Sequence, residues 1–218
     1  MLNKIRKACS INDKILFKIK QKLEKKEFLT EKDIENFIRS EAKKTRCTLA
    51  FKSVISTGKN TSEIHHKPTD KRIGKGFLML DFGVNYKGYC SDVTRMFYIG
   101  KPAKKEKEIY DLVLLAQKTA LSCAKPGEYA ADVDLIARNI LLKYFSHFRH
   151  GLGHGVGKKI HEGPHLRPRG RRILKENDVI TIEPGLYFKN FGVRIEDTIV
   201  VRNKPEILTK FTKELIII

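Results

Sequence analysis

The sequence of 218 residues has no tryptophan, only four cysteines, few acidic residues for its size and no long apolar run. The cysteines form no Cys-x-x-Cys pair, which argues against a structural zinc site or a disulfide scaffold and fits a reducing compartment. No stretch approaches the roughly 18 apolar residues of a membrane helix. The basic N-terminus is interrupted by Asp13 and lacks the apolar centre of a secretion signal. We therefore expect a cytoplasmic protein that contacts no membrane.

The shortage of acidic residues leaves 44 lysines and arginines against 25 aspartates and glutamates, a net charge of +19. Such an excess can serve phosphate binding in nucleic-acid-binding proteins. No zinc finger, recognition helix or aromatic-interleaved RNA motif accompanies it, so we interpret it as a solvated lysine-rich surface whose field can draw in peptide carboxylates. Several basic residues cluster after the second histidine motif, namely Arg167, Arg169, Arg171, Arg172 and Lys175.

Two acidic residues occupy matched positions in a predicted hairpin. The segment 77–98 is rich in β-branched and aromatic residues and is broken by turn-forming residues at 85–88. A hairpin centred between residues 86 and 87 places Asp81 opposite Asp92, with Cβ atoms roughly 4.5–5.5 Å apart. A single aspartate is usually a solvated surface charge, but this pairing has a counterpart later in the chain.

The segment 179–201 repeats the pattern, with its break at Lys189-Asn190. The same pairing argument places Glu183 opposite Glu196. Four acids that share a pocket repel one another unless strong positive charge lies between them, and a pair of divalent cations is the obvious candidate. The sequence therefore predicts a two-metal hydrolase.

Between the two hairpins lies the glycine-rich run 151–157, with His154 at its centre. Its glycines are not a dinucleotide fingerprint, because no strand precedes them and no helix follows; we interpret them as small residues that let the backbone approach a metal.

With these five residues in this order, the chain from about residue 51 to the C-terminus resembles the pita-bread metallopeptidases. These are the methionine aminopeptidases, aminopeptidase P and the Xaa-Pro dipeptidases (prolidases). Ser91-Asp92-Val93-Thr94-Arg95 is similar to the Ser-Asp-x-Thr-Arg of the Xaa-Pro branch, whereas methionine aminopeptidases usually have Gly-Asp and lack the arginine. The run His150 to Gly157, followed by His161-Glu162-Gly163-Pro164-His165, is also prolidase-like.

The resemblance implies a specific ligand set. Asp81 would chelate the first metal, Asp92 and Glu196 would bridge both ions, and His154 and Glu183 would complete the second. One nitrogen among many oxygens suits Mn²⁺ or Co²⁺ best, with Fe²⁺ or Zn²⁺ as alternatives. The free amine of a peptide substrate would lie near the first metal.

The resemblance also implies catalytic roles. Glu183 would accept the proton of the attacking water, His161 would donate to the developing oxyanion, and His65 would interact with the leaving nitrogen. The motif selects His65 over the adjacent His66, although either histidine is available from the sequence.

Three further residues are expected beside the ligands. Tyr187 matches a pocket position of the family, and a packed strand tyrosine is the alternative. Arg194 is expected to orient Glu196 or to pair with Asp197. His165 is expected to line the pocket, and a structural histidine is the alternative.

Helical periodicity predicts helices over residues 3–26, after an N-cap at Thr30, over 104–122 and over 129–145. Helices and hairpins that alternate in this order predict an α+β fold, an antiparallel-rich sheet covered by helices with an internal pseudo-two-fold. The resemblance identifies it as the curved pita-bread sheet. We expect residues 1–218 to form one catalytic domain. The additional N-terminal domain of the Xaa-Pro branch is expected to be absent, which leaves substrate length and a homodimer open.

The leading hypothesis is a metal-dependent exopeptidase that cleaves between an N-terminal residue and proline. Within the same class the alternative is a methionine aminopeptidase. From another class, the alternative is a catalytically silent relative that binds nucleic acid or acidic proteins through its basic surface.

Overall fold

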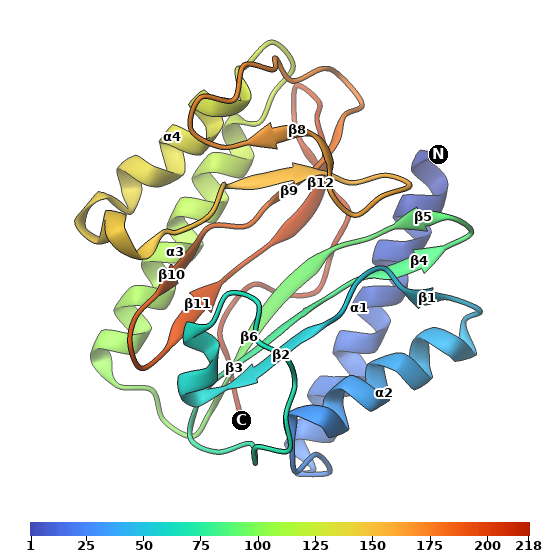
Figure 1. Cartoon of the computed structure of the whole chain (residues 1–218), viewed down its shortest axis with the longest axis vertical. Helices are drawn as coiled ribbons and strands as arrows, with labels where there is room; N and C mark the ends of the chain where they lie inside the picture. The colour runs from blue at the N-terminus through green and yellow to red at the C-terminus, as the bar shows by residue number, and fades with distance from the viewer.

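The computed structural model describes all residues from Met1 to Ile218. Two helices precede the first group of strands and two more precede the second, so the chain repeats one helix-and-strand pattern (Figure 1). The helices are α1 (Leu2–Glu24), α2 (Glu31–Lys44), α3 (Lys104–Cys123) and α4 (Ala130–Ile140), with short 3₁₀ segments η1 (Gly58–Ser62) and η2 (Leu142–His147).

The first half of the molecule contains a four-stranded sheet in the order β14-β6-β3-β2. A smaller sheet in the order β1-β4-β5 continues from it. These strands are β1 (Thr48–Leu49), β2 (Val54–Thr57), β3 (Gly76–Phe82), β4 (Val84–Tyr86), β5 (Tyr89–Cys90), β6 (Val93–Ile99) and β14 (Ile216–Ile217).

The second half contains a five-stranded sheet in the order β13-β12-β9-β7-β8 and the two-stranded β10-β11 hairpin. These strands are β7 (Gly153–Gly155), β8 (Glu162–Leu166), β9 (Val179–Ile182), β10 (Gly185–Tyr187), β11 (Gly192–Arg194), β12 (Asp197–Val200) and β13 (Glu206–Ile207). All pairings in this sheet and in the hairpin are antiparallel.

Alternation along β3 decides which side chains face which layer. Leu78, Leu80 and Phe82 are buried in the cluster that includes α1 and α2. Phe77 and Met79 point the other way, into the cluster formed with α3, α4 and the second half of the chain. Asp81 shares the parity of this second pair, so it faces the space between the halves.

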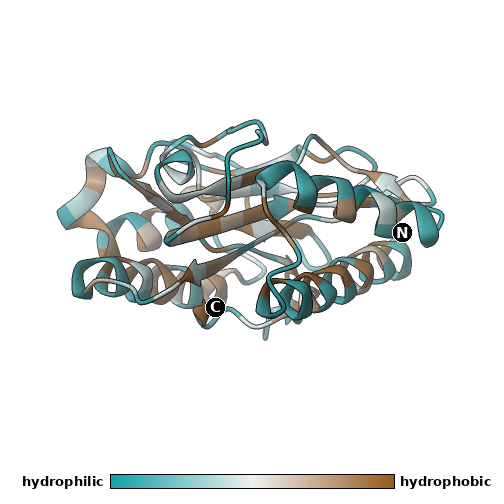
Figure 2. Cartoon of the chain, turned by 90° about the horizontal axis from the view of Figure 1, so that it is seen from below, coloured by the Kyte–Doolittle hydropathy of each residue, from teal (hydrophilic) through white to brown (hydrophobic).

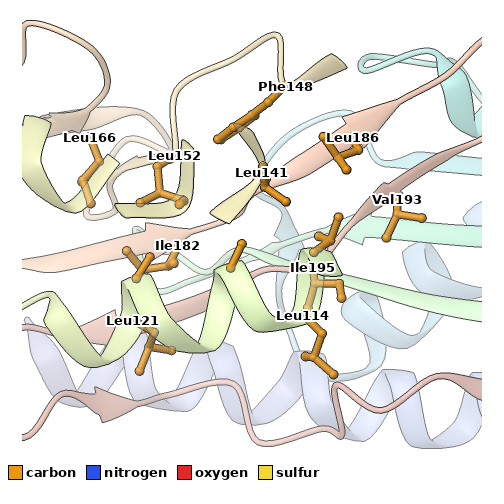
Figure 3. Close-up of a cluster of buried hydrophobic side chains, with 14 of the residues drawn as sticks. Leu114, Leu121, Leu141, Phe148, Leu152, Leu166, Ile182, Leu186, Val193 and Ile195 are labelled. Atoms are coloured by element: carbon orange, nitrogen blue, oxygen red, sulfur yellow. The ribbon is translucent and has the colours of Figure 1, made fainter. Parts of the chain in front are cut away.

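The larger apolar cluster fastens α3 and α4 to the second sheet. Leu114 and Leu121 of α3 pack in the same cluster as Ile182 of β9, with Leu152 and Leu166 around them (Figure 3). Apolar residues gather on the strands and on the inward sides of the helices, while the outer surfaces are hydrophilic (Figure 2). None of the helices combines the length and the apolar composition that crossing a bilayer requires.

The predicted α+β class and three of the four helices are confirmed. Thr30 caps α2 as expected: its hydroxyl accepts from the Asp33 N–H at 3.2 Å, and Asp33 Oδ2 accepts from the Thr30 N–H at 2.8 Å. The helix predicted over 129–145 is too long, because α4 ends at Ile140 and the chain continues as 3₁₀ helix. The chain reverses there, and Arg138 holds the reversal by donating to the carbonyl of His150 at 2.8 Å.

The register predicted for the first hairpin is wrong by two residues. Asp81 pairs with Thr94 rather than with Asp92, because the turn lies at Lys87-Gly88, whose φ angles of 50° and 81° are those of a type I′ turn. An offset of two keeps every side chain on its predicted face, whereas an offset of one would have reversed the faces. Asp92 therefore still points to the same side as Asp81.

The register predicted for the second hairpin is confirmed. Ile182 pairs with Asp197 on one side and Gly185 pairs with Arg194 on the other. These flanking pairs place Glu183 opposite Glu196.

Candidate metal centre

A cavity of about 950 Å³ lies between the halves of the molecule, and the five predicted ligands line it. Its lining includes Asp81, Asp92, His154, Glu183, Glu196, His65, His161, His165 and Arg194. A second cavity of about 650 Å³ beside α1 contains no comparable group of acids and histidines. The candidate chemistry therefore lies in the cavity between the halves.

Three of these side chains form a group that could hold a metal ion. Ligand atoms of Asp92, His154 and Glu196 all lie within 4.8 Å of one another. His154 Nε2 lies 3.2 Å from Glu183 Oε1 and 3.7 Å from Asp92 Oδ2. An imidazole nitrogen and several carboxylate oxygens thus converge on one point.

Two buried carboxylate oxygens of this group have no hydrogen-bond partner, Asp92 Oδ1 and Glu196 Oε1. Burial, together with the charge of Glu196, raises the pKa of Asp92 well above its ordinary value. Burial and the charge of Glu183 do the same to the pKa of Glu196. Buried oxygens that lack a donor and resist ionisation fit a divalent cation, which satisfies both needs.

Glu183 differs from these two acids. Burial alone would raise its pKa, but the hydrogen bond and charge of His154 outweigh burial and lower the pKa of Glu183 to about 2. Thr181 Oγ1 donates to Glu183 Oε1 at 3.1 Å and accepts from the His154 backbone N–H at 3.0 Å. The carboxylate is ionised and held in place, as a proton acceptor must be.

Arg194 has other partners than those expected. It donates to Asp81 Oδ2 and, at 2.6 Å, to the hydroxyl of Tyr187. Asp197 is instead held by Arg95, at 2.8 Å. The expected link between Arg194 and Glu196 exists only through Thr94: Arg194 Nε donates to its hydroxyl at 3.3 Å, and the hydroxyl donates to Glu196 Oε2 at 2.8 Å.

Tyr187 is buried beside the cavity and joins Arg194 to a histidine. His150 Nδ1 faces the Gly151 carbonyl at 2.8 Å, so Nδ1 carries the proton and Nε2 accepts from the Tyr187 hydroxyl at 2.9 Å. Burial lowers the pKa of His150 to about 4, which agrees with a neutral ring.

The remaining histidines occupy distinct positions. His65 and His161 are exposed to the cavity, and the His161 ring lies edge-on to His154 with centroids 4.4 Å apart. His165 is the strand partner of His154. His66 is buried against Glu31, with His66 Nε2 at 2.9 Å from Glu31 Oε2.

The glycines around His154 serve strand packing rather than approach to a metal. A Cβ at Gly153 would lie 2.0 Å from the Thr181 carbonyl oxygen, and one at Gly155 would lie 2.4 Å from that of Gly163. Their absence of side chains lets β7 fit between β8 and β9, which presents His154 to the cavity.

No role was predicted from the sequence for Thr94, Thr181 or Glu31. Thr94 stands within a quoted motif and Thr181 lies two residues before Glu183, so strand parity could have placed both on the cavity face. Glu31 follows a helix cap, and nothing local distinguishes it from an exposed first-turn acid.

The family model described as metallopeptidase family M24 matches residues 3–203. The chain is 42% identical over 219 residues to a Xaa-Pro dipeptidase of Pyrococcus horikoshii, covering 97% of this chain and 62% of that protein. It is 45% identical over 172 residues to a Xaa-Pro dipeptidase of Pyrococcus furiosus, covering 77% and 49%.

Solved structures agree with the sequence relatives. The prolidase from Pyrococcus horikoshii superposes with a TM-score of 0.93 at 39% identity, covering 99% of this chain and 63% of that one. A Xaa-Pro dipeptidase from Bacillus anthracis superposes with a TM-score of 0.95 at 34% identity, covering 100% and 62%. The chain spans about three fifths of the length of these two proteins.

Proposed function

The chain belongs to metallopeptidase family M24 and has the pita-bread fold, and we propose that it is a dinuclear-metal exopeptidase that hydrolyses the bond between an N-terminal residue and proline. The observation that carries the proposal is the convergence of Asp92, His154 and Glu196, with two buried carboxylate oxygens left without a donor. The likeness to Xaa-Pro dipeptidases supports the choice of substrate.

In this proposal five residues of the cavity lining, Asp81, Asp92, His154, Glu183 and Glu196, would hold two divalent cations. When bound, such a pair supplies Lewis acidity and makes water available as a nucleophile at neutral pH. The oxygen-rich set with one imidazole favours Mn²⁺ or Co²⁺. Arg194 does not compete with this role, because a carboxylate has about four lone-pair sites and Asp81 can satisfy both partners.

The side chains of the chain itself perform the proton and charge steps. Glu183 is ionised and takes the proton of the attacking water. His161, exposed at the cavity wall, donates a hydrogen bond to the oxyanion that develops at the scissile carbonyl. His65, on the loop between β2 and β3, interacts with the proline nitrogen as it leaves. Tyr187 and Arg194 keep Asp81 oriented.

Residues 1–218 act as the catalytic unit, on peptides with a free N-terminus, and neither nucleic acid nor membrane is a partner. The four free cysteines, three of them buried, support a reducing cytoplasm. A homodimer is compatible with the fold.

A metal-dependent peptide panel tests the proposal. Purified protein is stripped of metal, reloaded with Mn²⁺ or Co²⁺ and assayed on Xaa-Pro dipeptides, Xaa-Pro-Xaa tripeptides and Met-Ala peptides. Metal-dependent cleavage of the proline substrates is expected. Cleavage of Met-Ala peptides alone would indicate a methionine aminopeptidase, and a protein that binds no metal and cleaves nothing would indicate a silent binding module.

A further inference from the structure

The loop between β2 and β3 carries His65 to the cavity, and the residues on either side of His65 make the contacts that hold it. On one side stands a buried carboxylate, Glu31, at the first residue of α2. On the other side stands Arg194, at the end of β11. Neither contact was expected from the sequence.

Glu31 is fully buried and accepts five hydrogen bonds, all from this part of the chain. Its Oε1 accepts from the Thr57 N–H and from Asn60 Nδ2, both at 2.8 Å. Its Oε2 accepts from His66 Nε2 at 2.9 Å and from the N–H and hydroxyl of Thr69 at 3.0 and 2.8 Å. Burial would raise its pKa, but these donors, His66 first among them, lower it. One ionised carboxylate thus binds both ends of the segment 57–69.

The other side of the loop is fastened to the second half of the molecule. Arg194 Nη1 donates to the Ile64 carbonyl at 3.3 Å, and the Gly192 N–H donates to Thr61 Oγ1 at 2.8 Å. His65 therefore lies between a neighbour bonded by Arg194 and a neighbour bonded by Glu31. Its imidazole can move only as far as these two anchors allow.

We propose that Glu31, acting through His66, is a positioning residue that aims His65 at the leaving nitrogen of the substrate. The inference rests on the proposed function, because that function assigns His65 its role. Glu31 touches neither substrate nor metal ligands. Its contribution is to fix the loop, since a displacement of about 1 Å at a catalytic group can cost on the order of 10²-fold in rate.

The test compares the same substitution at two buried glutamates of α2. Glu31→Gln leaves one acceptor oxygen and turns an N–H₂ group toward the loop donors, so kcat on a Xaa-Pro dipeptide is expected to fall by on the order of 10²-fold, with KM and Mn²⁺ content near wild type. Glu41→Gln is the control. Glu41 is also buried, but it pairs with Lys18 and Lys44 and does not touch the loop, so its kcat is expected to stay unchanged.

A double-mutant cycle distinguishes positioning from general stabilisation. If Glu31 acts through His65, Glu31→Gln has no further effect on kcat in a His65→Ala background. Multiplicative losses in the double variant would overturn the proposal, as would equal effects of Glu31→Gln and Glu41→Gln. His66→Gln, which keeps an N–H for Glu31, is expected to retain more activity than His66→Leu.

Amide hydrogen exchange of the metal-free protein provides a readout that needs no activity. Residues 57–69 are expected to exchange faster in Glu31→Gln and not in Glu41→Gln, because the N–H groups of Thr57 and Thr69 donate directly to Glu31. Unchanged exchange would overturn the positioning role. Faster exchange in a protein that cleaves no Xaa-Pro peptide would support loop fixation while refuting the proposed function.

Discussion

Asp92→Asn should be more stable than wild type without metal and less stable than wild type with metal. In the metal-free protein, Asp92 Oδ1 is buried without a donor and faces other acids. A buried unsatisfied polar group costs about 1–3 kcal/mol, and an asparagine removes the charge and can donate to the facing Glu196 carboxylate. For a chain of this size about 1 kcal/mol corresponds to roughly 2–4 °C in Tm. Metal-free Asp92→Asn should therefore melt roughly 2–12 °C above metal-free wild type at pH 8.

Metal should reverse that order. At a Mn²⁺ concentration of 1,000 times the Kd, a single-site ligand stabilises the folded state by about 4.1 kcal/mol, more than the upper end of the advantage of the metal-free variant. Wild type should gain roughly 8–16 °C on that basis, whereas the variant, with one expected ligand removed, should gain little. Calorimetry of both proteins in EDTA and in Mn²⁺ measures the four melting temperatures.

The pH dependence has a defined sign. Because burial and Glu196 raise the pKa of Asp92 in the folded protein, proton uptake stabilises the folded state. That stability is present below the ordinary carboxyl pKa near 4 and is lost as the pH rises through the raised folded value. The Tm of metal-free wild type should fall across this window more steeply than that of Asp92→Asn.

Asp197→Asn is the control for this experiment, since Asp197 is equally buried but paired with Arg95. Removing one partner of a buried pair costs about 3–5 kcal/mol, so this variant should be less stable than wild type even without metal. The reasoning is refuted if Asp92→Asn also melts below wild type in EDTA. Equal Mn²⁺ gains in wild type and Asp92→Asn would remove Asp92 from the ligand set.

Three further outcomes are expected. His161→Ala should keep its metal by elemental analysis while kcat falls by roughly 10²–10³-fold, the cost of one oxyanion donor; a near-normal kcat would contradict that role. Burial lowers the pKa of His150 to about 4, so the folded state should lose about 3 kcal/mol of stability as the pH falls from about 6.5 to 4. His150→Gln should not show this loss. Urea unfolding at pH 7 and pH 4 measures the free energy of unfolding of both proteins, and an equal loss in both would contradict the prediction. Four residues of the basic cluster lie outside the cavity lining: Arg169, Arg171, Arg172 and Lys175. Replacing them by neutral residues should leave kcat/KM for a Xaa-Pro dipeptide unchanged, and a large loss would mean that they handle substrate.

Features encoded by local periodicity could be predicted from the sequence. The pairing of Glu183 with Glu196 followed from one turn and strand alternation. The first hairpin failed by two residues because Tyr86-Lys87 and Lys87-Gly88 are both plausible turn centres, and only the positive φ angles at the second pair decide between them. The error left the face of Asp81 unchanged, so the candidate site was unaffected.

Contacts between distant segments could not be predicted. Arg194 lies 113 residues from Asp81, and Glu31 lies 35 residues from His66. No periodicity links such positions. Arg194 has two acids close to it in the sequence, Glu196 and Asp197, but in the folded chain it binds Asp81. Arg194 ends β11 and Asp197 begins β12, and the two positions have opposite strand parity, which explains why Asp197 was the wrong partner.

The packing behind the acids explains why they stay together despite their repulsion. Leu80 and Phe82 flank Asp81 and are buried beneath α1 and α2, while Ile182 precedes Glu183 and is buried beneath α3. Each such side chain contributes about 1.5–3 kcal/mol by burial, and a strand that moved its carboxylate away would expose the residues on its other face. The repulsion between the acids must therefore be reduced at the carboxylates themselves, by a proton or a cation. If the proposed metal centre forms there, its affinity is therefore expected to depend on apolar packing far from the ligands.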